Sequence, residues 1–190
     1  MNGGTLSDVQ VDLATRLSAT PPDAALRMRY LMLVEDALRE AGVDPAIARP
    51  PRAMPPYTMF PVREFLPLVH AAGEAMGPTP EEGIARLFEG SFPKLIELPG
   101  ARMFISPLDR EPFSLLSRFA TSRSLAASYG EWEIEGAAGD ATLVIRREWA
   151  WIGAMWQPIL ASVFAACRLP AAHIDTTYED PYSARLRFRW

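Results

Sequence analysis

His173 and Asp175 could perform proton transfer, because they alternate on a predicted strand and so share one face of it. A histidine oriented by a carboxylate is a common general acid-base pair. The pattern therefore leaves open a small enzyme that acts on an apolar substrate. Two charged residues on the solvent side of a strand give the same pattern, and we favour that interpretation.

His70 is the other histidine of the chain, and it lies in the middle of a predicted helix, on one face with Leu66 and Gly73. An imidazole in that position could ligate haem or a metal ion. A partly buried helical histidine with a hydrogen-bonded nitrogen explains the position equally well, and we favour it. No histidine-cysteine cluster is present, so we predict no metal site and no resident cofactor, with haem on His70 as an alternative.

Large aromatic side chains gather late in the chain, where all five tryptophans lie. They could line a pocket for an apolar or planar ligand, or they could simply fill the core. The two outcomes overlap, since a core of large rings readily leaves a pocket. The residues that we expect around such a pocket are Trp149, Trp151, Trp156, Phe164, Tyr57 and Phe65.

Helical periodicity dominates the first two thirds of the chain. Thr20 is a candidate N-cap for an amphipathic helix that ends at Gly42, and the proline-rich residues 43–61 cannot continue it. A second helix is predicted over 62–76. Thr79 and Glu82 then form a capping box around Pro80, which predicts a third helix. The helical signal extends from 112 to about 130.

Beyond Gly130 the hydrophobic period changes from helical to two, which is typical of strands. Residues 131–149 and 172–190 each read as a hairpin, and the apolar residues 151–169 between them as a buried helix. We therefore predict an α+β fold: a helical N-terminal half followed by a four-stranded antiparallel sheet with a buried helix between the hairpins.

The last predicted strand, "YSARLRFRW", alternates apolar residues with a row of arginines at 185, 187 and 189. The row could bind an anion. We favour a solvated sheet face, because Glu131, Glu133 and Glu135 on the neighbouring hairpin could neutralise the arginines by cross-strand ion pairs.

Length and charge narrow the class of protein. The 190 residues suit one domain, 20–190, after a partly ordered segment 1–19. A net charge of −4 argues against nucleic acid, and no apolar run is long enough for a membrane span. The single cysteine, Cys167, and the lack of a secretory signal suggest a cytoplasmic protein.

The order of these parts resembles a known family. Residues 25–190, with "YTMFPVREFLPLVHAAGEAMGPTPEEGIARLFEGSF", "EWEIEGAAGDATLVIRREWAWIGAMWQPILASVF" and the closing "DPYSARLRFRW", are similar to the DUF2378 family, a set of myxobacterial paralogues. That family looks distantly like the haem-NO-binding, vinyl-reductase-type and TRAPP-type domains. The resemblance implies N-terminal helices before a four-stranded sheet, a sensing, regulatory or scaffolding role, and a homodimer.

We therefore expect a non-enzymatic regulatory or small-ligand-binding sensor with an aromatic-lined pocket, which binds a small molecule or a protein partner. The alternatives are a haem-based gas or redox sensor that uses His70, and the small enzyme that uses His173 and Asp175.

Overall fold

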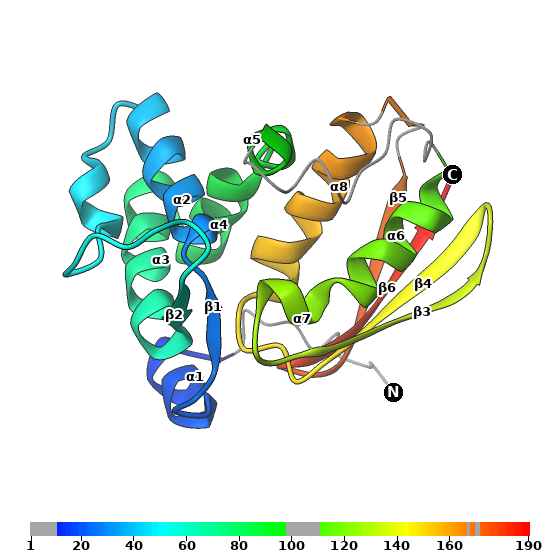
Figure 1. Cartoon of the computed structure of the whole chain (residues 1–190), viewed down its shortest axis with the longest axis horizontal. Coiled ribbons are helices and arrows are strands. Elements are labelled where there is room, and N and C mark those ends of the chain that lie inside the picture. The colour runs from blue at the N-terminus through cyan, green and yellow to red at the C-terminus, as the bar shows by residue number, and fades with distance from the viewer. Residues whose placement is uncertain (1–10, 98–110, 167, 170–171) are drawn as a thin grey trace.

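The computed structural model describes residues 11–97, 111–166, 168–169 and 172–190, so Cys167 lies outside it. Helices α1 to α5 and a small two-stranded ladder form one half of the molecule, and a four-stranded sheet with α6, α7 and α8 forms the other (Figure 1). The predicted α+β class is confirmed. The first half comprises α1 (Leu13–Ala19), β1 (Ala25–Arg27), α2 (Arg29–Glu40), η2 (Pro45–Ala48), β2 (Met59–Pro61), α3 (Val62–Met76), α4 (Pro80–Phe88) and α5 (Phe92–Glu97).

The N-terminal helix expected from Thr20 onward was predicted too long. Its first part is strand β1, in which Leu26 pairs with Phe60 of β2, and the helix α2 begins only at Arg29. Leu26 and Phe60 are both fully buried, so tertiary pairing outweighs the local helical pattern here. The proline-rich residues 43–61 return to the start of α2. The backbone N–H of Met28 donates to the carbonyl of Thr58, and that of Arg29 donates to the carbonyl of Pro56.

Helices α3 and α4 pack unusually closely through glycines. A Cβ atom placed on Gly83 would stand 1.9 Å from the carbonyl oxygen of Gly73, and one on Gly73 would stand 2.5 Å from the carbonyl oxygen of Pro80. The predicted start of α4 is confirmed, since the hydroxyl of Thr79 accepts a hydrogen bond from the N–H of Glu82. Any side chain at position 83 would therefore push two helix backbones apart.

The second half contains α6 (Pro112–Thr121), α7 (Arg123–Ala126), β3 (Glu131–Ala137), β4 (Asp140–Arg146), the π-turn η4 (Ile152–Trp156), α8 (Gln157–Ala166), β5 (His173–Asp180) and β6 (Ser183–Arg189). The strand order is β3-β4-β6-β5, with every neighbouring pair antiparallel. The outer strand β5 carries a register shift between Tyr178 and Asp180. A single helix was expected over 112–130. The structure has two shorter helices there, α6 and α7, which are separated at Ser122.

One face of the sheet is packed and the other is wet. The packed face carries buried side chains of β3, β4 and β6, and Phe188 stacks on Phe164 of α8 with ring centroids 5.7 Å apart. Arg185, Arg187 and Arg189 point to the opposite face, as the alternation predicted.

Candidate functional site

A hollow lies where the two halves of the molecule meet. It has a volume of ≈ 460 Å³, within the range of about 300–1,000 Å³ that is typical of small-molecule sites. One wall comes from the residues just before β1, and the others come from the α7–β3 connection and from the segment after β4. We call it the junction hollow, and its lining is Pro21, Asp23, Ala24, Ser124, Ala127, Ser128, Tyr129, Gly130, Glu131, Arg147 and Trp149.

Two left-handed residues shape the rim of the junction hollow. Gly130 has φ +79°, and Arg147 has φ 55°, a conformation that costs a non-glycine residue about 1–2 kcal/mol. The guanidinium of Arg147 is ion-paired with the carboxylate of Glu131 across the rim. Backbone strain of this kind is found most often at binding and switch sites.

Aromatic rings supply the apolar part of the hollow. Trp149 packs on Tyr182 with ring centroids 4.7 Å apart, and Tyr129 also belongs to the lining. Burial raises the pKa of Tyr129 well above its ordinary value, and the nearby carboxylate of Glu148 raises it further, so the phenol stays protonated. The hollow thus offers planar apolar surface beside serine hydroxyls.

A buried ion pair lies directly behind Gly130. The guanidinium of Arg123 (Nη2) is 2.6 Å from Oε2 of Glu148, and the two side chains are 4% and 0% exposed. Trp132 Nε1 and the backbone N–H of Ala150 also donate to Glu148, each at 3.3 Å. Burial is the largest single influence on the pKa of Arg123 and acts to lower it, but Glu148, Tyr129 and Tyr30 together outweigh burial and raise that pKa.

Three rings enclose the Arg123 cation. Its Cζ lies 4.8 Å from the ring of Tyr129, 5.1 Å from Trp132 and 4.9 Å from Trp156. Trp156 meets Tyr30 of α2 edge-on at 5.4 Å. This aromatic cage therefore connects the sheet half to the helical half.

A second buried arginine, Arg16 of α1, supports Trp149 through its backbone. Its Nη1 donates to the carbonyl of Trp149 at 3.1 Å, and its guanidinium lies 5.2 Å from the ring of Trp151. Sequence reasoning missed Arg16, Arg123 and Glu148. A charged residue on a short helix or after a strand ordinarily faces water, so the sequence carries no signal for their burial.

The predicted pocket residues lie in three different places. Only Trp149 lines the junction hollow. Trp151, Trp156, Phe65 and Phe164 are at most 2% exposed and fill the core. Tyr57 lies on the surface and is 40% exposed.

His70 lies on α3 with its side chain 23% exposed. Its Nδ1 is 3.9 Å from a carboxylate oxygen of Glu74, and its ring is 6.5 Å from the ring of Trp151, centroid to centroid. His70 does not line the junction hollow, nor does it line a second hollow on the outer face of the sheet that is described below.

His173 and Asp175 do meet, as their alternation predicted. His173 Nε2 is 2.8 Å from a carboxylate oxygen of Asp175, and the side chains are 70% and 45% exposed. Asp175 is shared with Arg189 of β6. A catalytic role for the pair stays a prediction.

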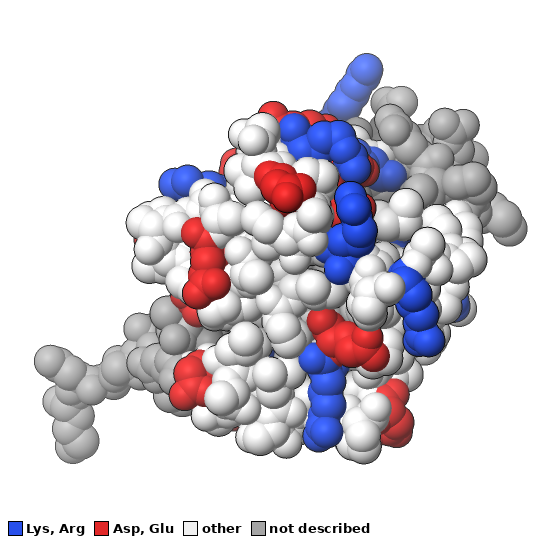
Figure 2. Space-filling model, turned by 90° about the vertical axis from the view of Figure 1, so that its left-hand side faces the viewer, with Lys and Arg blue, Asp and Glu red and all other residues white. Residues whose placement is uncertain are grey.

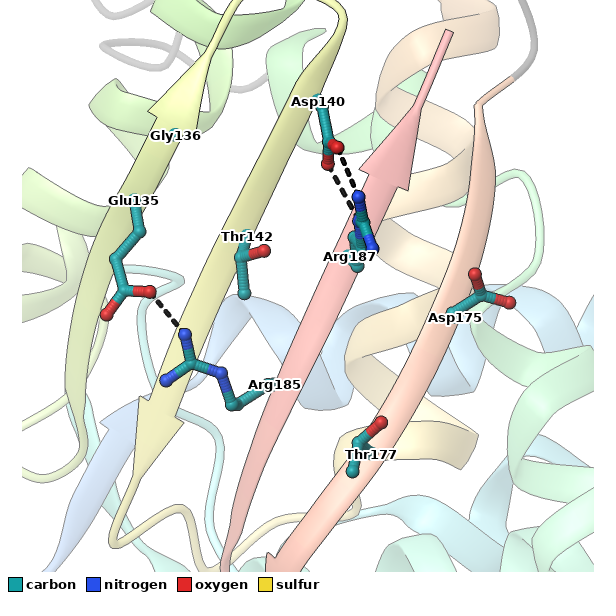
Figure 3. Close-up of a pocket in the computed structure, with 8 residues that line it drawn as sticks. All are labelled: Glu135, Gly136, Asp140, Thr142, Asp175, Thr177, Arg185 and Arg187. Carbon is teal, nitrogen blue, oxygen red and sulfur yellow. Dashed lines mark hydrogen bonds and ion pairs between the residues drawn. The ribbon is translucent and has the colours of Figure 1, made fainter.

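The wet face of the sheet forms a second, open hollow of ≈ 670 Å³, the outer hollow. Figure 3 shows Arg185 reaching across β4 to Glu135 and Arg187 making a two-pronged contact with Asp140, with Thr142 between them. Each arginine of the row is paired with a carboxylate, but only Arg185 uses one of the three predicted glutamates, since Arg187 pairs with Asp140 and Arg189 with Asp175. Glu133 pairs instead with Arg146.

The pairing on the wet face predicts a specific titration. The hydrogen bond and positive charge of Arg187 hold the pKa of Asp140 below its ordinary value of 3.8. A carboxylate with a depressed pKa stabilises the fold above about pH 3.8, and that contribution is lost as the pH falls through the folded-state pKa. Replacing Arg187 by glutamine should raise the pKa of Asp140, as measured by carboxyl-carbon NMR. In Arg39→Gln, which breaks only the pair with Asp36, the pKa of Asp140 should stay unchanged.

The described residues form neither a metal-ligand cluster nor a membrane-spanning helix. Within the described ranges, no three histidine, cysteine, aspartate or glutamate side chains come together as metal ligands do. No helix in the described part of the chain is long and apolar enough to cross a membrane.

Comparison with known proteins supports the fold but names no family. No family model matches the chain, so the resemblance to DUF2378 receives no support, and no curated protein matches it. Solved structures do match. The Fe(II) unliganded H-NOX (haem-NO/oxygen-binding) protein from K. algicida has a TM-score of 0.68 at 12% identity, and the match covers 86% of this chain and 96% of that one.

A second H-NOX structure, an oxygen-binding domain related to soluble guanylate cyclases, matches with a TM-score of 0.53 at 11% identity over 85% of this chain and 89% of its own. A third H-NOX structure, a doubly substituted Tt variant, matches with a TM-score of 0.56 at 11% identity over 97% of this chain and 95% of its own. Another solved structure, described by haem redox potential and protein-induced porphyrin distortion, has a TM-score of 0.54 at 11% identity, and the match covers 97% of this chain and 100% of that one. This chain is therefore structurally similar to H-NOX domains along most of its length.

Proposed function

We propose that this protein is a non-enzymatic sensor domain that binds a small molecule where its helical half meets its sheet half. The observation that carries the proposal is the likeness to H-NOX domains, which extends over nearly the whole chain. The junction hollow supports it, because residues from both halves line it and its aromatic walls suit a planar ligand.

The connections behind the hollow suggest how binding could be transmitted. Trp149 follows Glu148 directly, and its carbonyl is held by Arg16 of the helical half. A ligand that displaces Trp149 therefore acts on the Arg16 contact and on the Arg123–Glu148 pair together. The Arg16 contact joins the two halves directly, and the Arg123–Glu148 pair lies in the aromatic cage that also connects them. A local displacement at the hollow therefore changes how the halves pack.

Haem on His70 is the alternative, and the comparisons favour it over a different ligand, because the matched structures are described by haem and iron chemistry. The surroundings of His70 do not fit a haem as they stand. Its imidazole faces Trp151, which is 1% exposed, and Nδ1 lies toward Glu74. A porphyrin could approach the ring only if the side chains packed there moved aside. The sensor proposal therefore does not depend on haem.

One set of variants separates the two candidates. We would examine freshly purified protein by native mass spectrometry, and then titrate it with hemin and with the planar fluorophore anilinonaphthalene sulfonate. Replacing Trp149 by alanine should weaken binding of a retained ligand or of the fluorophore about tenfold, roughly 1.4 kcal/mol. Tyr57→Ala, an exposed aromatic elsewhere, is the control and should bind normally.

Other results would change the assignment. A one-to-one haem complex with a Soret band that shifts in His70→Ala would make this a haem-based sensor. A bare mass, together with no saturable binding of either probe that depends on Trp149 or His70, would overturn the sensor proposal.

A further inference from the structure

The lining of the junction hollow contains more carboxylates than cations. Asp23 and Glu131 contribute carboxylates, whereas Arg147 is the one basic residue among the lining residues. Arg147 is already ion-paired with Glu131. Asp23 is exposed and, within the part of the chain that the structure describes, makes no ion pair. The hollow therefore has a surplus of one negative charge.

The position of Asp23 is set by hydrogen bonds to the α7–β3 connection. The hydroxyl of Ser128 donates to the carbonyl of Asp23 at 3.2 Å and accepts from the N–H of Ala25 at 2.9 Å. The N–H of Ser128 donates to the carbonyl of Ala25, also at 2.9 Å. These bonds hold the backbone of Asp23, so its carboxylate stays beside the hollow.

Positive and negative charges also occur together behind Trp149. Arg16 lies with its Cζ 5.4 Å from the ring of Tyr182, on which Trp149 packs. Burial is the largest influence on the pKa of Tyr182 and raises it; the charge of Arg16 acts to lower that pKa, and the charges of Asp180 and Asp12 act to raise it. Two carboxylates therefore oppose one guanidinium around this stack.

Other charges near the hollow largely cancel. The buried Arg123–Glu148 pair adds no net charge, since its two members lie 2.6 Å apart. Acidic and basic side chains are interspersed over the outer face of the helical half (Figure 2), so that face has no large patch of one sign. The groups that line the hollow therefore decide the sign of the field inside it.

We propose that the junction hollow binds an organic cation, an alkylated ammonium or pyridinium ion, that lies against Trp149 with the carboxylate of Asp23 as its counter-ion. Indole is the aromatic side chain that attracts cations most strongly, and aromatic walls are the usual receptors of alkylated ammonium groups. Arg123 already occupies a position over the ring of Tyr129, so Trp149 is the wall that receives the cation. This inference rests on the proposed function and adds the charge class of the ligand.

Three planar probes test the charge of the ligand. N-methylquinolinium and methylnaphthalene have nearly the same size and shape and differ in charge, and naphthoate is the corresponding anion. The full chain should bind N-methylquinolinium about tenfold more tightly than methylnaphthalene, and naphthoate most weakly. Quenching of tryptophan fluorescence, together with ligand-observed NMR, would measure the three affinities.

Two variants separate charge from apolar contact. Asp23→Asn should lower the affinity for N-methylquinolinium about fivefold and remove most of its salt dependence, but leave methylnaphthalene binding unchanged. Trp149→Leu keeps an apolar wall without an aromatic face, so it should weaken binding of the cation more than binding of the hydrocarbon. Glu179→Gln, which removes an exposed carboxylate of β5 outside the hollow, is the matched control and should bind all three probes normally.

The outcomes distinguish this inference from the proposal on which it rests. Equal affinity for the three probes, tightest binding of naphthoate, or an unchanged salt dependence in Asp23→Asn would overturn the inference. In each of those cases, binding that still depends on Trp149 would leave the hollow as the ligand site. If no probe shows saturable binding that depends on Trp149, both the inference and the hollow as a ligand site are wrong.

Discussion

Replacing Gly83 by alanine should destabilise the fold by about 3 kcal/mol, at the upper end of the range for overpacking. The added methyl group would lie 1.9 Å from the carbonyl oxygen of Gly73 and 2.8 Å from its Cα. Both are backbone atoms of α3, so no side-chain rotation can relieve the clash. Alanine also favours helix over glycine by about 1 kcal/mol, so any net loss must come from the forced separation of α3 and α4.

Gly42→Ala provides the comparison for Gly83→Ala. Gly42 has φ +73°, and nothing lies within 4 Å of the place that a methyl group would occupy, so the substitution costs only the left-handed backbone penalty of about 1 kcal/mol. Urea unfolding followed by far-UV circular dichroism would measure both variants. A loss in Gly83→Ala no larger than that in Gly42→Ala would show that the two helices are not in close contact.

Replacing Arg123 by methionine should cost about 3–5 kcal/mol, because it leaves the carboxylate of Glu148 buried without its partner. Trp132 Nε1 and the N–H of Ala150 would still donate to this carboxylate, but neither neutralises its charge. Urea unfolding followed by far-UV circular dichroism would measure the loss.

The double variant Arg123→Met/Glu148→Gln should recover most of that loss. Glutamine removes the negative charge but keeps an acceptor oxygen for Trp132 Nε1 and for the N–H of Ala150. We expect the double variant to be within about 1–2 kcal/mol of the unsubstituted protein, because replacing a whole buried pair is often nearly neutral. A double-mutant cycle with no coupling energy would contradict the pair as described.

The sequence predicted the elements whose signals are local. The N-cap at Thr79, the change of period at Gly130 and the alternation up to Arg189 all depend on near neighbours, and each is found in the structure. The ladder of β1 with β2 was missed, because Leu26 forms a strand only through its pairing with Phe60.

The candidate site was harder to predict, because it depends on long-range contacts between charged residues. Arg123 becomes buried only when Glu148 and three aromatic rings reach it from other elements. The tryptophan cluster was correctly noticed, yet the sequence does not distinguish Trp149, which lines the hollow, from Trp151, which lies in the core. Both tryptophans follow the turn after β4, where Arg147 takes a left-handed conformation.

The register shift in β5 bears on how this protein avoids uncontrolled assembly. In the described sheet β5 is an outer strand, and an outer strand presents backbone groups to which another chain can add. The irregularity between Tyr178 and Asp180 interrupts the regular spacing of those groups, and Asp175 and Glu179 add charge along the same strand. At β5 a second copy therefore finds no long, flat edge on which to continue the sheet, which disfavours fibre growth by strand addition at this strand.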